Sequence, residues 1–142
     1  MLPCNTLHEI LPSLRKETKV PIIDLVEETT KILTEYEIVG ILASTRTKES
    51  KIYNKSSNVT NIIYPTKAEQ DKISHIIIKI IRKLYEDTDK LEIHNIISNL
   101  KKRGAEKVIL ACTDLPNITG KDEFLIDTQE VLISSIKRIM DS

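Results

Sequence analysis

The sequence predicts an α/β fold in which a parallel four-stranded sheet is flanked by helices. Short apolar runs that suit strands alternate along the 142 residues with longer segments whose apolar residues follow helical spacing. The clearest run, Val39-Gly40-Ile41-Leu42-Ala43, carries no polar side chain, as expected for a strand with helices over both faces. Four strands are expected, three containing Val39, Val59 and Val108 and a short one near Val20 or Leu125.

The N-terminal part is expected to hold two helices separated by a strand. Asn5 or Thr6 can cap the first helix, and Pro12 inside it predicts a kink or an early end. The apolar run at residues 20–23 is interpreted as a buried strand, and Asp24 is expected to cap the helix that follows it.

The middle of the chain is predicted to contain two further strands. Residues 37–43 form the first of them, and the polar turn at residues 44–47 leads into a short helix. Residues 59–64 form the other strand, which Pro65 ends. A polar turn directly after a buried strand is where α/β proteins place ligand-binding residues.

Two long helices precede the next strand. The first runs from about residue 66 to 84 and carries apolar residues at the i, i+3, i+4, i+7 and i+8 positions. The second runs from about residue 91 to 103 and is followed by Gly104, which suits the left-handed residue after a helix. Residues 107–111 form the strand that comes next.

The last segment is a short apolar link at residues 125–126 and a helix capped by Asp127 or Thr128. Apolar residues recur along this helix at helical spacing and are expected to face inward. They are Leu132, Ile133, Ile136, Ile139 and Met140.

Composition and charge exclude several classes of function. The chain carries 21 basic and 21 acidic residues, so it lacks the basic excess that a nucleic-acid or anionic-membrane partner requires. No apolar run approaches the roughly 20 residues that span a bilayer, and no basic segment followed by an apolar core indicates a secretory signal. We therefore expect a cytoplasmic protein with free thiols and with no nucleic-acid or membrane partner.

The two cysteines lie in similar motifs near opposite ends of the chain, Pro3-Cys4-Asn5-Thr6 and Ala111-Cys112-Thr113-Asp114. Both motifs and the 44–47 turn are expected at the carboxyl edge of a parallel sheet, where ligands bind. The polar residues after each cysteine suit a helix start, whose N–H groups and dipole favour a thiolate. The alternatives are an inert buried thiol for Cys112 and a disordered terminus for Cys4.

These motifs, together with four further segments, resemble the aspartate/glutamate racemase family over essentially the whole chain. The first motif continues to His8, and the second continues as Leu115-Pro116. The further segments are Val20-Pro21-Ile22-Ile23-Asp24, Val39-Gly40-Ile41-Leu42-Ala43 with Thr47, Ser50 and Tyr53, Pro65 with Glu69 and Gln70, and Leu125-Ile126-Asp127-Thr128.

The resemblance implies an amino-acid racemase that needs no pyridoxal phosphate, metal or other cofactor. Cys4 and Cys112 would be the catalytic thiols, one removing the α-proton and the other returning a proton to the opposite face. The substrate would be a small acidic amino acid, aspartate or glutamate. The substrate-binding residues would be Asn5, Thr6, Ser44, Thr47 and Thr113, although capping of helices is the alternative role for such side chains.

Three other positions follow from the same resemblance. His8, one helical turn after Cys4, would stabilise its thiolate, and a surface histidine without a role is the alternative. The basic residue expected after the long helix falls on Lys90, and the final motif has Gln129-Glu130-Val131 in place of the family's usual histidine.

The resemblance also implies two similar α/β domains. Residues 1–36 would be the later part of the first domain, residues 37–120 the second domain, and residues 121–142 a final helix that returns to the first. The family's opening segment has no counterpart, so we expect an incomplete first domain and low activity. Apolar residues left without their usual cover predict a homodimer or, as the alternative, partial disorder of the residues before Glu37. These apolar residues are Ile22, Ile23, Leu132, Ile133 and Ile136.

The alternative function is that of a shortened family member without turnover. Such a chain would serve as a binding module for an amino acid or as the partner of a separately encoded half.

Overall fold

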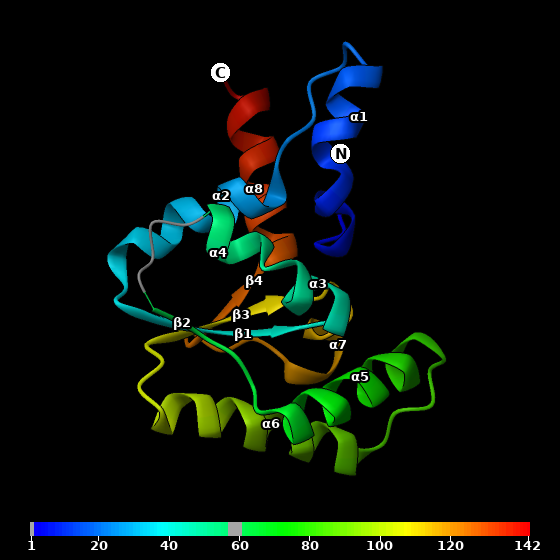
Figure 1. Cartoon of the computed structure of the whole chain (residues 1–142), viewed down its shortest axis with the longest axis vertical. Helices are drawn as coiled ribbons and strands as arrows, with labels where there is room; N and C mark the ends of the chain where they lie inside the picture. The colour runs from blue at the N-terminus through cyan, green and yellow to red at the C-terminus, as the bar shows by residue number, and fades with distance from the viewer. Residues whose placement is uncertain (1, 57–60) are drawn as a thin grey trace.

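The computed structural model describes residues 2–56 and 61–142, and within them four strands form one parallel sheet (Figure 1). The sheet order is β2-β1-β3-β4, and β1 pairs with β3 in register from Val39–Lys107 to Ala43–Ala111. Residues 59 and 60 of the predicted third strand lie outside the described residues. The predicted fold class is confirmed. The strands are β1 (Ile38–Ala43), β2 (Asn61–Ile63), β3 (Lys107–Ala111) and β4 (Leu125–Asp127).

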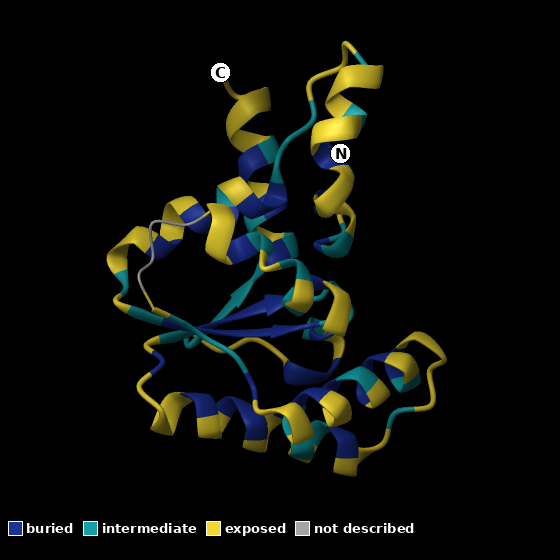
Figure 2. Cartoon of the chain, in the orientation of Figure 1, coloured by how far each residue is buried: buried dark blue, intermediate teal, exposed yellow. Residues whose placement is uncertain are grey.

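Helices cover both faces of the sheet (Figure 1). On one face lie α5 (Lys67–Ile81) and α6 (Asp87–Lys102), and on the other lie α2 (Leu25–Ile32), α4 (Ile52–Ser56) and α8 (Thr128–Met140). Side chains alternate along β1, so Leu42 packs with α5 and α6 whereas Ile41 packs with α2 and α4. The central strands are therefore buried on both sides (Figure 2), which explains their uninterrupted apolar sequence.

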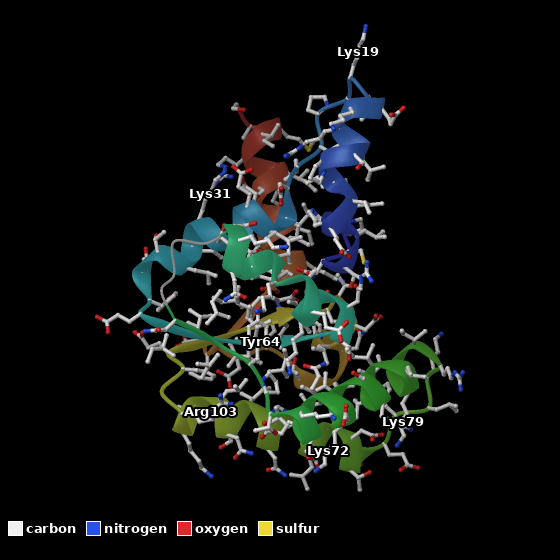
Figure 3. All side chains as sticks on the ribbon, in the orientation of Figure 1. Lys19, Lys31, Tyr64, Lys72, Lys79 and Arg103 are labelled. Atoms are coloured by element: carbon white, nitrogen blue, oxygen red, sulfur yellow. The ribbon has the colours of Figure 1, made fainter. Side chains whose placement is uncertain are left out.

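Charged side chains join α5 to α6. Lys79 Nζ lies 2.9 Å from Asp89 Oδ1, and Lys72 Nζ lies 2.7 Å from Glu92 Oε1, with both lysines on α5 (Figure 3). The Asp89 carboxylate also accepts the N–H of Glu86 at 2.8 Å, which closes a capping box at the start of α6. This cap starts α6 earlier than its apolar pattern alone predicts.

Left-handed residues end both of these helices. Helix α5 stops at Ile81 because Lys83 adopts φ +57°, which lets the Leu84 N–H donate to the Lys79 carbonyl at 2.8 Å. The predicted continuation to about residue 84 is therefore wrong. Gly104, at φ +98°, occupies the same position after α6, as its sequence position predicts.

The N-terminal segment is a 3₁₀ helix (Thr6–Ile10) that continues into α1 (Leu11–Glu17). Pro12 lies in the first turn of α1, where the N–H that proline lacks has no helical partner to lose. The break that Pro12 predicts thus falls at the start of α1, and Leu11 is buried beside it.

The strand predicted at residues 20–23 is wrong. This segment is extended chain between α1 and α2, outside the four-stranded sheet, and Val20 is 70% exposed. A strand exists only with a hydrogen-bonded neighbour, and within the described residues the sheet ends at β2 and β4. The fourth strand lies instead at Leu125. The predicted cap of α2 is present, because the Asp24 carboxylate accepts the Glu27 N–H at 3.0 Å.

The apolar stripe predicted on α8 is only partly buried. Leu132 and Ser135 face inward, whereas Ile133, Ile139 and Met140 are 49%, 56% and 79% exposed. The reason is that α8 packs on α2, β3 and β4 near its start, and its later turns extend past the sheet (Figure 2).

A carboxylate joins α8 to α2. Ser135 Oγ donates to Glu28 Oε2 at 2.8 Å, Arg138 donates to the same oxygen, and Lys31 Nζ lies 2.6 Å from Oε1. Burial opposes ionisation of Glu28, but these three donors outweigh it and lower the pKa of the carboxyl from 4.5 to about 2.

We expect Glu28→Gln to lower the free energy of unfolding at pH 7 by about 1–2 kcal/mol, because three charge-assisted or neutral hydrogen bonds are weakened. Since the folded pKa lies below the unfolded one, the contribution of Glu28 is complete above about pH 4.5 and is lost as the pH falls towards 2. Urea unfolding at pH 7 and pH 3 measures this. Glu27→Gln, which removes an exposed pair with Lys31, is the matched control, and an equal effect of both variants would contradict the prediction.

Candidate active site

Segments that follow three strands meet at the carboxyl edge of the sheet. Strands β1 and β3 end in register, so Ser44 and Cys112 leave the sheet from neighbouring strands. Thr128 follows β4 on the other side of β3. Asn5 and Thr6, near the N-terminus, lie at the same edge: the Asn5 side chain bonds to Thr128, and the Thr6 side chain bonds to Ser44. The fold therefore brings both cysteine motifs and the 44–47 turn together.

Three hydroxyl groups form a cluster at this edge. Thr6 Oγ1 lies 2.8 Å from Thr47 Oγ1 and 3.1 Å from Ser44 Oγ, and the last two oxygens are 3.1 Å apart. Ser44 is also the N-cap of α3 (Thr45–Ser50), where its Oγ accepts the Thr47 N–H. This hydroxyl cluster of Thr6, Ser44 and Thr47 joins the first cysteine motif to the end of β1.

The Asn5 side chain is held inside the protein. Its Oδ1 accepts a hydrogen bond from the Tyr53 hydroxyl, and its Nδ2 donates to Thr128 Oγ1 at 3.0 Å. Thr128 Oγ1 in turn donates to the Leu110 carbonyl at 3.1 Å. Asn5, Tyr53 and Thr128 are at most 2% exposed. Both ends of the Asn5 amide therefore have protein partners.

His8 is 3% exposed and uses both ring nitrogens in backbone contacts. Nε2 accepts the Leu25 N–H at 3.0 Å, so Nδ1 carries the proton that bonds to the Cys4 carbonyl at 2.8 Å. Neither expectation for His8 fits, because it is not at the surface and has no ring nitrogen left for the Cys4 thiolate. It instead fixes the Cys4 backbone against the start of α2.

Cys112 is half-buried beside Asp114, with 3.9 Å between its Sγ and Asp114 Oδ2. Burial raises the pKa of the Cys112 thiol to about 11. The backbone N–H groups of Asp114 and Leu115 oppose the rise, whereas the negative charges of Asp114 and Cys4 add to it. The expected lowering of this pKa by a helix start is wrong, because the helix that follows, α7 (Pro116–Thr119), is too short to offset desolvation.

The two cysteines lie at the same edge of the sheet, because Asn5, the residue after Cys4, bonds through Thr128 to Leu110 on β3. Both are free and half-buried. Thr113, next to Cys112, is also half-buried, and its carbonyl accepts a hydrogen bond from Gln129 Nε2 at 2.9 Å. Gln129 thus ties the second cysteine motif to the start of α8.

An open hollow of about 750 Å³ adjoins the second cysteine motif. Its polar lining includes Lys83, Tyr85, Asp114 and Asn117. Lys90, the basic residue that the sequence suggests for this region, instead forms an exposed ion pair with Asp87 at 3.0 Å and does not line the hollow.

Sequence reasoning missed four residues of this edge. Tyr53 appears in the sequence only as part of a family-like segment and Thr128 as a possible helix cap, although the position of Thr128 directly after a strand is a usable signal. Asp114 lies within the cysteine motif and could have been found from its place two residues after Cys112. Lys83 has no sequence signal, because its left-handed backbone is usually a glycine position.

Two features of other protein classes are absent from the residues that the structure describes. No group of three or more His, Cys, Asp or Glu side chains suited to holding a metal ion lies within residues 2–56 and 61–142. Over the same residues, no helix is long and apolar enough to cross a membrane.

The chain resembles known proteins in sequence. Residues 1–136 match the family model described as Asp/Glu/Hydantoin racemase. The chain is also 28% identical over 133 residues to a protein of Pectobacterium carotovorum subsp. carotovorum described as "Uncharacterized protein in pnlA 3'region", covering 84% of this chain and 85% of that protein.

Solved structures share the fold. They include an aspartate racemase homologue from Pyrococcus horikoshii OT3 (TM-score 0.80, 19% identity) and the aspartate racemase of Picrophilus torridus (0.78, 22%). A glutamate racemase from Francisella tularensis subsp. tularensis SCHU S4, solved in complex with D-glutamate, has a TM-score of 0.62 at 19% identity. These matches cover 98%, 96% and 96% of this chain but 65%, 59% and 56% of the respective structures. The chain thus spans about three fifths of the length of these solved structures.

We expect alkylation of Cys112 by iodoacetamide to accelerate about tenfold per pH unit from neutral pH towards 11, because only the thiolate reacts. The folded protein is labelled at successive pH values and then digested, and mass spectrometry of the peptide that contains Cys112 measures its alkylation rate. Asp114→Asn should speed alkylation at pH 8 by removing a charge that raises the Cys112 pKa, and Asp141→Asn on the exposed end of α8 is the control. A rate that is already constant above pH 8 would contradict the prediction.

Proposed function

This chain belongs to the Asp/Glu/Hydantoin racemase family, and we propose that it moves the α-proton of an acidic amino acid between the thiols of Cys4 and Cys112. Both cysteine motifs meet at one edge of the sheet, and this observation carries the proposal. The edge also holds the hydroxyl cluster and the hollow beside Asp114, which supports a site for a small polar ligand.

The proton transfer needs one thiolate and one thiol at the start. The thiolate takes the α-proton and becomes a thiol, which leaves a carbanion at the α-carbon. The other thiol gives its proton to the opposite face of that carbon and becomes the thiolate. The raised pKa of Cys112 keeps its proton in place at neutral pH, so we assign the role of acid to Cys112, which leaves the role of base to Cys4.

The substrate contacts follow from the same geometry. We assign the α-carboxylate to the hydroxyl cluster of Thr6, Ser44 and Thr47, and we include Thr113 because it flanks Cys112. Asn5 acts by holding the first motif, since its amide already has protein partners. Lys83 at the rim of the hollow supplies a cation for a second carboxylate, which favours aspartate or glutamate over neutral amino acids.

We place this activity in the reducing cytoplasm, where free thiols persist. We also propose that the chain is divided into a part of a first domain (residues 1–36), a second domain (37–120) and a final segment that returns to the first (121–142). A second candidate is binding of an amino acid without turnover. The raised pKa of Cys112 favours this second candidate. Racemisation in both directions requires the Cys112 thiol to give up its proton, and a thiol with a pKa of about 11 is rarely ionised at neutral pH.

We expect the chain to exchange the α-proton of D- and L-aspartate and of D- and L-glutamate in deuterated water, followed separately for each enantiomer by NMR. Cys4→Ser and Cys112→Ser should each abolish racemisation, because serine is far too weak an acid to replace a thiolate. Each variant should still exchange the enantiomer that its surviving thiol faces. Alanine, which lacks the second carboxylate, is the control substrate.

Full racemisation by Cys4→Ser would overturn the two-thiol mechanism. Exchange of alanine at the rate of aspartate would remove the role of Lys83. No exchange by the unaltered chain, combined with calorimetric binding of aspartate or glutamate, would support binding without turnover instead.

We also propose a homodimer. On α8, Ile133, Ile139 and Met140 are between 49% and 79% exposed, and on α2 Ile32 is 42% exposed; large apolar side chains left exposed are typical of interfaces. Light scattering after size exclusion is expected to give twice the chain mass of 16.2 kDa. Ile139→Lys should shift the protein to the monomer, while the exposed Leu91→Lys on α6 should not, and a monomeric unaltered chain would contradict the proposal.

A further inference from the structure

We propose that Thr128 is a positioning residue that sets Cys4 opposite Cys112 through a buried chain of hydrogen bonds. This chain, the Asn5 relay, consists of the Tyr53 hydroxyl, the Asn5 amide, the Thr128 hydroxyl and the Leu110 carbonyl. The positioning is a property of the fold, and only its catalytic consequence rests on the proposed function.

The relay joins the two cysteine motifs directly. Asn5 is the residue after Cys4, and Leu110 lies on β3 two residues before Cys112. Thr128 bridges them, with Asn5 Nδ2 at 3.0 Å on one side and the Leu110 carbonyl at 3.1 Å on the other. A shift of the Thr128 hydroxyl therefore changes the position of Cys4 relative to β3.

Capping of α8 does not explain the Thr128 hydroxyl. The N-cap of α8 is Asp127, whose carboxylate accepts the Gln129 N–H at 2.8 Å. Thr128 is fully buried, and its hydroxyl both accepts from Asn5 and donates to Leu110. A buried hydroxyl with both functions used fixes the geometry of its partners, because an unpaired donor or acceptor there would be costly.

Tyr53 fixes the orientation of the amide. Its hydroxyl is a donor, and burial raises its pKa, so it keeps its proton. Asn5 Oδ1 must therefore face Tyr53, which turns Nδ2 towards Thr128. Tyr53 comes from α4, so the relay ties three separate elements to the first cysteine motif.

Two further contacts hold this motif: the hydroxyl cluster holds Thr6 to the end of β1, and His8 holds the Cys4 backbone without touching β3. His8 holds the Cys4 carbonyl to the N–H of Leu25, at the start of α2. Neither contact involves β3 or the segment that carries Cys112. His8 thus limits the backbone conformation at Cys4, while the Asn5 relay sets the distance between the first cysteine motif and the second.

The test uses the fact that the chain has two cysteines. Dibromobimane becomes strongly fluorescent when it bridges two nearby thiols, so its bridging rate at low protein concentration reports their separation without requiring activity. We expect the unaltered chain to form an intramolecular bridge between Cys4 and Cys112. Thr128→Val, which keeps the shape but lacks the hydroxyl, should bridge at least about tenfold more slowly, since displacements near 1 Å have effects of this size.

Thr128→Ser is the matched control, because it keeps the hydroxyl and should bridge within about twofold of the unaltered chain. Monobromobimane, which reacts with single thiols, should label Cys4 and Cys112 at unchanged rates in all variants. A loss of fold would instead expose both thiols and speed this labelling. If Thr128→Val does not fold, Tyr53→Phe removes the first hydrogen bond of the relay and should also slow bridging.

Equal bridging rates in Thr128→Val, Thr128→Ser and the unaltered chain would overturn the positioning role while leaving the two-thiol mechanism open. Failure of the unaltered chain to bridge, at a pH where monobromobimane labels both cysteines, would overturn it as well, since the thiols would then not face each other. If Thr128→Val bridges more slowly than Thr128→Ser and the unaltered chain, but no amino acid exchanges its α-proton, the positioning role is supported. That result would count only against the proposed function.

Discussion

The parallel pairing of β1 with β3 is the constraint on which the rest of this structure depends. Five residue pairs hold the strands in register and end them together at Ala43 and Ala111. Because side chains of both strands are buried under helices on each face, a slip of one residue would turn apolar groups towards the wrong layer. The register therefore makes Ser44 and Cys112 neighbours independently of any contact between the side chains of the site.

The N-terminal segment reaches this edge by polar rather than apolar contacts. Asn5 and His8 are both at most 3% exposed, and all of their polar side-chain groups have protein partners, three of them on other elements and one, His8 Nδ1, on the Cys4 carbonyl. Buried hydrogen bonds add little net stability but exclude alternative arrangements, because a displaced group would lose its partner without gaining water. Such contacts suit a segment that must present one thiol in a fixed place.

Local pattern predicted the elements that are decided locally. The strand around Ile41 and the left-handed Gly104 follow from short runs of sequence, and the cysteine motifs indicated the functional edge. The prediction of a strand at residues 20–23 was wrong because a strand needs a neighbouring strand to pair with, and the local sequence does not show whether one is present. The Asn5–Thr128 contact joins residues 123 positions apart, so no periodicity could reveal it. Lys83 was missed because its left-handed backbone at the end of α5 is a conformation that sequence pattern assigns to glycine.

The two thiols differ most in their surroundings. Cys112 ends a buried strand, where desolvation dominates and the carboxylate of Asp114 adds negative charge, so its proton is held tightly. Cys4 lies on a short turn whose backbone is anchored by His8 but whose sulfur is not paired with a carboxylate among the described contacts. The proposed exchange of protons between the two thiols requires that they not both ionise, and the desolvated position of Cys112 after β3 favours that condition.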